Sequence, residues 1–594
     1  MTQSKPAKRR HFLAGLGAVA TAGTGGDAAD HMQRPPEVPG SKLAQGVSAQ
    51  SLRERRPNIL LIVSDQERSG ADLPAGLDLQ AHEWLQERGV SFTQYHANTT
   101  PCSPSRSNIY FGQHTQHTHV TANIGAPPTF PRLTPGIHSL GHLLRAQGYY
   151  TAYKGKWHLS PIAHDPGLVY GRYPSTADAL EPFGFADFNA NGDPHGSTWT
   201  GYKFDGETAS HAVQWLSTKG KSMRGRQPWC LAVNFVNPHD IMYFTTGAQQ
   251  TSTRGGKDLL SPLAGAPRGA LYDKYWDLPL PNSFYAANPA VKPWAQRSYV
   301  DLCNFMFGHI DPHDEAAWRS YQSYYFNCIR DMDTHMMTVL RALDELGLTD
   351  ETIVIYTADH GEMAGAQKMR QKGPHMYKEN VRLPFIVRHP DLGGGVSTAA
   401  LASCIDLTPT LLGFAGVQPQ TTAEMYPYLK GVDISAAVAS PQARTERDRR
   451  GVLFNYGVPL YMDPDFTRKS VATNHVIDRL TPLRVGLRGG QFFPSRHNNA
   501  LFRGIHDGRY KFARYFKPAE HHKPRDWDTL TRHNELELYD TLADPDELHN
   551  LAAQPDLNKT LLMSLAARTN DLIDIEIGAD DGSEFPGPRV LYNL

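Results

Sequence analysis

Three runs along the chain are almost continuously apolar, and each ends abruptly in polar residues. They are Asn58–Ser64, Leu231–Val236 and Thr352–Thr357. Apolar residues at consecutive rather than alternate positions are typical of parallel strands buried on both faces. Helical periodicity over Tyr321–Leu346, with Gly347 placed as the C-cap, predicts a crossover helix before the third strand. This alternation predicts an α/β fold, specifically an α/β sandwich with a large, mostly parallel central sheet.

The residues that follow these runs are carboxylates and imidazoles. Asp65 follows the first run, His239 comes shortly after the second, and Asp359 with His360 follows the third. The carboxyl ends of parallel strands meet at one edge of an open sheet, where α/β proteins place their sites. Each residue alone has an ordinary explanation as a helix N-cap or a solvated loop side chain. Together, Asp65, Asp359 and His360 predict a site for a hard divalent cation such as calcium or magnesium.

A second candidate site is the stretch from Pro101 to Arg106, which contains the pattern Cys-x-Pro-x-Arg starting at Cys102. The ordinary interpretation is a free, half-buried cysteine beside a proline turn. The chain has five cysteines in all. Their spacing gives neither a disulfide framework nor the Cys-x-x-Cys of a zinc site.

Length and charge limit the classes of function. After removal of a leader, the chain is long enough for one large α/β domain and a smaller companion. The formal net charge is -1, from 59 basic and 60 acidic residues. This balance gives no overall positive electrostatic potential of the kind that attracts nucleic acid, and we expect no nucleic-acid partner. The 27 histidines favour metal binding or proton transfer near neutral pH.

Residues 1–30 have the layout of a twin-arginine export signal. Arg9 and Arg10 precede a short Ala- and Gly-rich run, Leu13–Ala22, which is too short to span a bilayer. Residues 31–56 have no periodic apolar face and are interpreted as a linker. We expect export by the twin-arginine translocase to the periplasm or the medium, with no membrane span. The alternative is a disordered basic tail that happens to contain two arginines.

Motifs over residues 57–410 resemble, in order, those of the type I (formylglycine-dependent) sulfatases of the alkaline phosphatase superfamily. The motifs are the strand ending at Asp65, Cys102–Arg106, Gly148–His158, Asn237–Asp240, Asp359–Glu362 and Lys372–Pro384. Three later runs are similar to the closing antiparallel sheet of that family: Asp507–Phe512, Glu537–Asp540 and Asp544–Leu551. The resemblance implies a catalytic domain at 57–440 and a smaller C-terminal antiparallel subdomain at 441–594.

The resemblance also implies the nucleophile and its cation. Cys102 would be oxidised to formylglycine by a formylglycine-generating enzyme, and the hydrated aldehyde would attack the sulfur of a sulfate ester. One divalent metal ion would be held by Asp65, Cys102, Asp359 and His360, with calcium expected first and manganese or magnesium as alternatives. Arg106 would hold the nucleophile through its fixed charge.

The remaining roles fall on two lysines and two histidines. The resemblance places Lys156 on a sulfate oxygen and lets His158 take the proton that regenerates the aldehyde. His239 and Lys372 would bind the sulfate near the leaving oxygen and protonate it. By spacing alone, Lys-Trp-His favours a surface lysine beside a tryptophan at the edge of the core, and the full string Gly148–His158 reverses that preference.

Two positions depart from the commonest sulfatase pattern, namely Gln66 after Asp65 and His360 after Asp359. Both resemble the choline-sulfatase and phosphonate-monoester-hydrolase branch, and we do not count Gln66 as a ligand. The first hypothesis is therefore hydrolysis of an organic sulfate ester, from a small molecule or a saccharide. The alternatives are a phosphonate monoester or phosphodiester hydrolase with the same nucleophile, and a catalytically silent binding protein.

The segment Thr251–Pro281, rich in Gly, Pro and aromatic residues, is expected to be an inserted loop beside the site. Tyr272, Tyr275, Trp276 and Trp294 could form an aromatic wall for the alcohol portion of the substrate, although ordinary packing is the usual role of such clusters. His375 and Lys378 have no predicted role. The alcohol itself is not identified by any motif.

Overall fold

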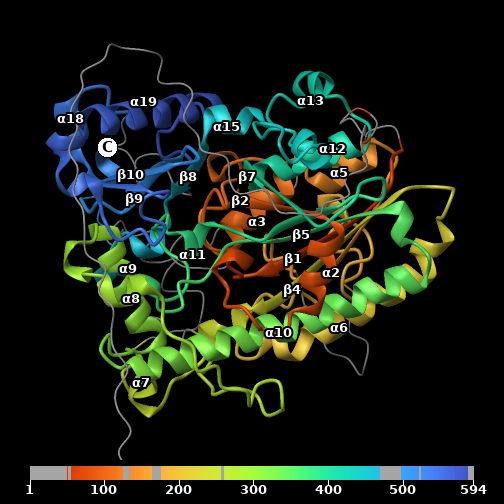
Figure 1. Ribbon diagram of the computed structural model, residues 1–594, viewed down its shortest axis with the longest axis horizontal. Helices are drawn as coiled ribbons and strands as arrows, with labels where there is room; N and C mark the ends of the chain where they lie inside the picture. Colours follow the sequence, from red (N-terminus) through yellow and green to blue (C-terminus); the bar gives the residue numbers. More distant parts are fainter. Residues whose placement is uncertain are drawn as a thin grey trace, which may run out of the picture. The chain divides into compact units, whose positions relative to one another are not determined.

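In the described part of the chain, seven strands form a central sheet in the order β3-β4-β1-β5-β6-β2-β7 (Figure 1). Only β6 runs antiparallel to its neighbours, while the pairs β3/β4, β4/β1, β1/β5 and β2/β7 are parallel. The strands are β1 Asn58–Asp65, β2 Val90–His96, β3 Tyr150–Gly155, β4 Trp229–Pro238, β5 Thr352–Ala358, β6 Phe385–Arg388 and β7 Val396–Ser403. The predicted sandwich with a mostly parallel sheet is confirmed.

The computed structural model describes residues 50, 52, 55–124, 133, 136–162, 176–255, 260–468, 495, 497–520 and 523–585. All of them lie in the second of two units, Ser41–Leu594. The expected export signal at 1–30, and the linker at 31–56 except for four of its residues, lie outside the described residues.

The three apolar runs of the sequence become β4, β1 and β5, side by side at the centre of the sheet. Every residue of these strands is buried. Along β1, Leu61 and Val63 face one core and Leu60 and Ile62 face the other. A strand that buries both faces needs apolar residues at consecutive positions, which is why the apolar runs correctly predicted these three strands.

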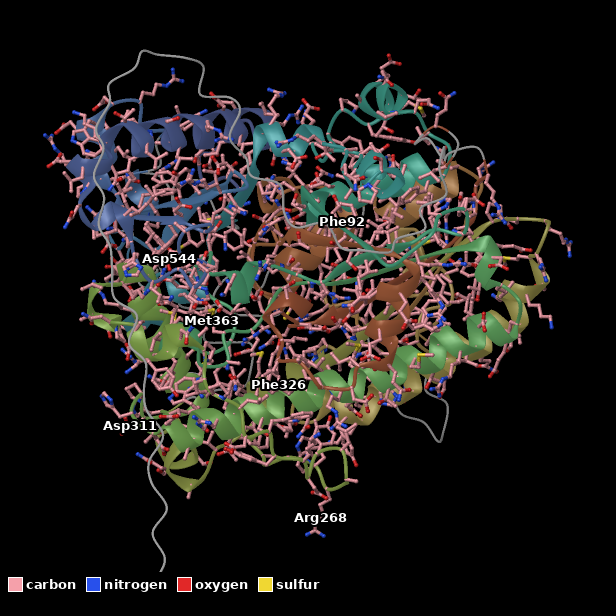
Figure 2. The ribbon with its side chains drawn as sticks, in the orientation of Figure 1. Phe92, Arg268, Asp311, Phe326, Met363 and Asp544 are labelled. Atoms are coloured by element: carbon pink, nitrogen blue, oxygen red, sulfur yellow. The ribbon has the colours of Figure 1, made fainter. Side chains whose placement is uncertain are left out.

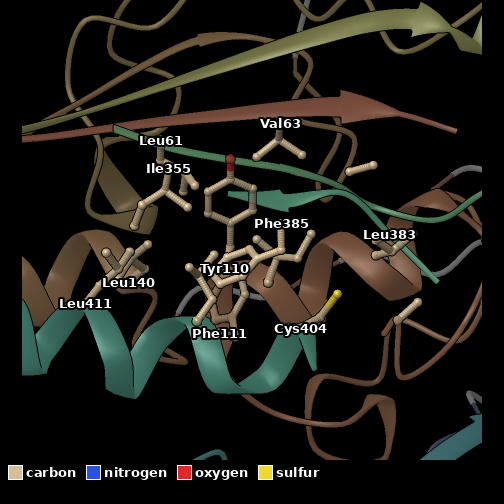
Figure 3. Close-up of a cluster of buried hydrophobic side chains, with 14 of the residues drawn as sticks. Leu61, Val63, Tyr110, Phe111, Leu140, Ile355, Leu383, Phe385, Cys404 and Leu411 are labelled. Carbon is tan, nitrogen blue, oxygen red and sulfur yellow. The ribbon is translucent and has the colours of Figure 1, made fainter. Parts of the chain in front are cut away.

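Helices cover both faces of the sheet (Figure 1). On one face, Tyr110 and Phe111 of α3 pack with Leu61 and Val63 (Figure 3). On the other face, Met332 and Met336 of α10 belong to the same cluster as Leu60 and Ile62 of β1. Side chains fill the space on both sides, with Phe92 labelled on β2 and Phe326 on α10 (Figure 2). The helices that share these two core clusters with the sheet include α2 Gln80–Arg88, α3 Cys102–Phe111, α5 Leu140–Ala146, α6 Thr200–Trp215, α10 Glu315–Glu345 and α12 Leu407–Phe414.

The long helix α10 was predicted from residue 321 and begins at Glu315. Its start is set by a local cap that periodicity does not report, because the Asp314 carboxylate accepts a hydrogen bond from the Ala317 backbone N–H at 3.0 Å. Gly347, at φ +67°, follows its last turn as expected. Within the described residues, no helix has the length and apolar character needed to cross a membrane.

Shorter helices fill the connections of the described chain. They are α4 Thr115–Thr118, α7 Ala248–Ser252, α8 Asn282–Ala286, α9 Trp294–Phe307, α11 Lys378–Val381, α13 Pro419–Met425, α14 Ser435–Ala439, α15 Glu446–Arg450 and α18 Trp527–His533.

A second, antiparallel sheet is built from β8 Val452–Tyr456, β9 Leu501–His506, β10 Tyr510–Phe516 and β11 Glu535–Asp540, in the order β11-β10-β9-β8. The helix α19, Lys559–Glu576, packs on it through Leu565 and Ile573. The expected smaller antiparallel sheet is therefore present. The domain boundary at residue 440 stays a prediction.

Candidate active site

The predicted metal ligands come together at the carboxyl ends of β1 and β5. These strands are neighbours in parallel register, with Ser64 opposite Ala358, so Asp65 and Asp359 leave the sheet side by side. The thiol of Cys102, the first residue of α3, lies 3.2 Å from His360 Nε2 and 3.6 Å from Asp65 Oδ1. One candidate ligand atom from each of these side chains lies within 4.8 Å of all the others.

The chemistry of this cluster fits a divalent cation. All four side chains are buried. Burial, together with the neighbouring Asp65 charge, raises the pKa of Asp359 to about 6. The two buried carboxylates therefore repel each other, and a cation bound between them would remove this electrostatic repulsion. Two oxygens, one imidazole nitrogen and residue 102 form a donor set suited to calcium, magnesium or manganese rather than a closed zinc site.

Arg106 lies one helical turn after Cys102 and is completely buried. Its guanidinium donates to the Trp157 carbonyl at 3.0 Å, to the Tyr153 hydroxyl at 2.9 Å and to Asp359 Oδ2 at 3.4 Å. Although burial lowers its pKa, nearby Tyr153 and Asp359 more than offset this effect and raise the pKa above its usual value. The group is therefore a permanent positive charge one helical turn from Cys102.

The loop after β3 brings in Lys156 and His158. Lys156 is buried and its ammonium forms an ion pair with Asp65 Oδ2, so it is not a surface lysine. Trp157 points into the core. The Asp193 carboxylate accepts hydrogen bonds from the backbone N–H groups of Trp157 and His158, at 2.9 and 2.8 Å. Asp193 belongs to no motif that the sequence offered, and it holds this loop in place.

His239, directly after β4, and Lys372, in the loop after β5, join the same site. The Lys372 ammonium contacts Gln66 Oε1 and lies 3.1 Å from Met242 Sδ. Nδ1 of His239 is buried without a hydrogen-bond partner among the described residues. Burial, and then the charge of Lys372, lowers the pKa of His239. At Asp65, burial raises the pKa, but nearby positive charge, that of Lys156 first and that of Lys372 as well, outweighs it and holds the pKa well below its usual range.

Sequence reasoning assigned no role to Asn234 and Gln66, which hold these side chains through hydrogen bonds. Asn234 Oδ1 accepts hydrogen bonds from Arg106 and, at 2.7 Å, from the Tyr110 hydroxyl. Its signal was a lone amide inside an otherwise apolar strand. Gln66 donates to Glu362 Oε2 and accepts from Lys372, so in this structure it links those two side chains.

The four aromatic residues proposed as a wall do not form one surface, and only Tyr272 and Trp276 share a cluster. Tyr272 and Trp276 are buried against α10, and Trp276 Nε1 donates to Asn327 Oδ1 at 2.9 Å. Tyr275 is 55 % exposed, and Trp294 packs with other clusters at the start of α9. The inserted segment is therefore largely anchored by packing against the helix.

The two residues without a predicted role stay outside the ligand cluster. His375 is buried, and neither of its ring nitrogens has a hydrogen-bond partner among the described residues. Lys378 forms an ion pair with Asp546 at 2.7 Å.

A mostly parallel sheet with a buried ligand cluster at its carboxyl edge, and a smaller antiparallel sheet after it, defines an enzyme of the alkaline phosphatase superfamily. The family model described as Sulfatase matches residues 57–417. The chain belongs to the sulfatase family and is therefore a sulfuric ester hydrolase.

Known proteins support this assignment. An ulvan-active sulfatase of Formosa agariphila is 24% identical over 545 residues, which cover 89% of this chain and 82% of the relative. A choline-sulfatase of Rhizobium meliloti is 26% identical over 411 residues, covering 66% of this chain and 73% of the relative. The fold is similar to that of a phosphonate monoester hydrolase from Silicibacter pomeroyi, with a TM-score of 0.57, 19% identity, and coverage of 88% and 96% of the two chains.

Proposed function

We propose that this protein hydrolyses an organic sulfate ester to an alcohol and inorganic sulfate, with formylglycine made from Cys102 as the nucleophile. The observation that carries the proposal is the placement of Cys102 within the cluster of Asp65, Asp359 and His360, whose ligand atoms lie within 4.8 Å of one another. A position that only needed a packed thiol would not require two carboxylates and an imidazole around it.

The charges around this position suit an anionic substrate. Arg106, Lys156 and Lys372 bring three cationic side chains to a buried site that contains two carboxylates. Although burial lowers the pKa of Lys156, the charge of Asp65 outweighs it and raises the pKa, so this ammonium stays protonated. In a site with little water, these charges can hold the sulfate group and stabilise charge that develops on it.

His158 and His239 supply the proton transfers in this proposal. Burial lowers the pKa of both imidazoles well below the usual value, so both are neutral near pH 7. A neutral imidazole can accept a proton or, in its other tautomeric nitrogen, donate one. We assign His158 to proton removal at residue 102, and His239 with Lys372 to the leaving oxygen.

The residues Asp65, Asp359, His360 and position 102 would hold one divalent cation. The oxygen-rich donor set favours calcium, with manganese or magnesium as alternatives. When bound there, the cation supplies positive charge that favours the deprotonated form of a neighbouring hydroxyl. In the present structure, the Cys102 sulfur stands where the oxygen of the converted residue would be.

Burial of Cys102 also bears on where conversion takes place. The thiol is 0 % exposed in the folded protein, so a formylglycine-generating enzyme would have to act before folding is complete. Conversion in the cytoplasm followed by export of the folded protein satisfies this order. We therefore propose a periplasmic or secreted enzyme that uses the twin-arginine translocase.

The test is production of the protein with and without a formylglycine-generating enzyme. Peptide mapping of the converted protein should show a loss of about 18 Da at Cys102, and activity on a panel of sulfate esters should follow the converted fraction. Cys102→Ala should fold and lose nearly all turnover. Active protein that contains only unmodified cysteine would contradict the mechanism. Faster turnover of phosphonate monoesters or phosphodiesters in the same panel would contradict the substrate class.

A further inference from the structure

The loop that carries Lys372 has little secondary structure of its own. It runs from the end of β5 at Ala358 to the start of α11 at Lys378, and in this fully described stretch the only helical segment is a short 3₁₀ turn, Ala366–Lys368. Since no strand or longer helix fixes its path, side-chain contacts decide where it lies. The loop ends next to the second sheet (Figure 1).

The face of the second sheet that meets this loop is polar. Along β10 and β11, alternate side chains point to opposite faces. Phe512 and Leu538 pack with α19 on one face, whereas Lys511, Tyr515 and Glu537 contact the loop from the other. These three side chains are buried. Buried charged groups are costly unless they are paired, so their partners show what this face holds.

Glu537 is the centre of this contact. Its Oε1 accepts hydrogen bonds from the Tyr377 hydroxyl at 2.8 Å and from the Tyr539 hydroxyl at 3.0 Å. Its Oε2 accepts from Gln296 Nε2 at 2.7 Å and from the Tyr515 hydroxyl at 2.6 Å. Both carboxylate oxygens are therefore paired, and one of the donors, Tyr377, belongs to the loop.

The Tyr377 hydroxyl also accepts a hydrogen bond, from the Lys292 ammonium at 2.6 Å. Burial, and then the charge of Glu537, raises the pKa of Tyr377 well above its usual value. The hydroxyl therefore keeps the proton that it donates to Glu537. In a buried network of this kind, paired polar groups specify one arrangement of the elements that carry them.

A second connection holds the backbone of the loop. Lys511 Nζ donates to the Met376 carbonyl at 2.9 Å and forms an ion pair with Glu547 Oε1 at 2.7 Å. Glu547 Oε2 in turn accepts from the Lys378 backbone N–H at 2.7 Å. Met376, Tyr377 and Lys378 are thus each bonded to the second sheet or to the segment that follows it.

The chain between these connections and Lys372 is closely packed. An added Cβ on Gly373 would stand 2.7 Å from the ring of Tyr299, and the Gly373 carbonyl accepts from Thr100 Oγ1 at 3.2 Å. Lys372 itself is 4 % exposed. A shift of residues 376–378 would therefore move the Lys372 ammonium, because close packing leaves the side chain little room to compensate.

We propose that Glu537 and Lys511 of the second sheet are positioning residues for Lys372, which they place by fixing the loop at Tyr377 and Met376. The smaller sheet thus takes part in catalysis without touching the substrate. The proposal rests on the proposed function, in which Lys372 acts at the leaving oxygen. Misplacing this ammonium matters most for esters of weakly acidic alcohols, because their leaving oxygen needs the most stabilisation.

The experiment measures kcat/KM of the converted enzyme for para-nitrophenyl sulfate, whose alcohol is a good leaving group, and for phenyl sulfate, whose alcohol is a poorer one. Tyr377→Phe and Lys511→Met each remove one connection and nearly keep the size of the side chain. We expect each to lower kcat/KM for phenyl sulfate by about 10-fold, with a smaller loss on the nitrophenyl ester. Metal content, from elemental analysis, should stay at the wild-type level.

The decisive measurement repeats both changes in the Lys372→Ala background. Without the ammonium the two connections have nothing to position, so each change should lower kcat/KM by less than about twofold further. Glu537→Gln, which removes the charge at the centre of the contact, should behave like Tyr377→Phe. Tyr510→Phe, which removes a hydroxyl from the α19 face of the same sheet, is the matched control and should stay within about twofold of wild type.

The outcomes separate this inference from the proposed function. Hydrolysis of neither ester by the converted wild type would overturn both, and full activity of Lys372→Ala would remove the role on which both rest. With an active wild type, the positioning role alone is overturned by unchanged kcat/KM in both variants, by equal losses on the two esters, or by a loss that persists in Lys372→Ala. If Tyr377→Phe does not fold, Lys511→Met decides the question, since it breaks a separate hydrogen bond.

Discussion

Raising the pH should destabilise the protein through one buried histidine, His82 on α2. Its Nε2 lies 2.8 Å from Glu67 Oε1 and its Nδ1 lies 2.6 Å from Asp333 Oδ1, and all three side chains are buried. Glu67 is two residues after Asp65. The imidazole therefore joins the loop that carries a predicted metal ligand to α2 and α10.

The size of the stability change follows from the difference between the pKa of His82 in the folded and in the unfolded protein. Burial lowers the pKa of His82, but the two carboxylates outweigh burial and raise it from 6.5 to about 10. A raised pKa means that the folded state binds the proton more tightly. The resulting stability is complete below about pH 6.5 and is lost as the pH rises through about 10. At 1.36 kcal/mol for each pH unit, this interval corresponds to at most about 5 kcal/mol.

The assay compares urea unfolding of the wild type and of His82→Gln between pH 6 and pH 10. Subtracting the two free energies of unfolding removes the titration of all other groups that behave alike in both proteins. We expect the difference to shrink by several kcal/mol across this range. Hydrogen exchange at the ring C–H of His82 in the wild type reports the pKa directly, and His549→Gln, at a largely exposed histidine, serves as the control.

Two results would refute this reasoning. One is a difference in unfolding free energy that stays constant from pH 6.5 to pH 10. The other is a hydrogen-exchange midpoint for His82 near the ordinary value of about 6.5. If His82→Gln does not fold, the exchange midpoint in the wild type decides the question alone.

Two further predictions concern the metal site and export. Asp359→Ala should lower metal content and turnover together, and added metal should restore part of the activity, whereas Lys372→Ala should keep the metal and lower kcat/KM by about 10². Elemental analysis checks both, and metal loss in the lysine variant or full retention in the aspartate variant would contradict the assignment. Replacing Arg9 and Arg10 with lysine should leave unprocessed protein in the cytoplasm. Cell fractionation checks this, and normal export of the double variant would count against the signal.

The local pattern of the sequence was sufficient for the centre of the fold. A strand buried on both faces has to be apolar at consecutive positions, so β1, β4 and β5 could be read directly. Strands of the same direction present their ends at one edge, so Asp65 and Asp359 could be predicted to meet. Cys102 could be added to this predicted site because the Cys-x-Pro-x-Arg motif consists of neighbouring residues.

Only the tertiary structure decided which distant side chains complete the site. Lys156 pairs with Asp65 across 91 positions of the chain, and Asn234 meets Arg106 across 128. No spacing rule connects such residues, because their contact depends on how the strands are ordered and how the loops pack on them. The same holds for Asp193, which lies outside every motif and whose carboxylate holds the backbone of Trp157 and His158. The sequence therefore determined the chemistry that is available, and packing decided where it is assembled.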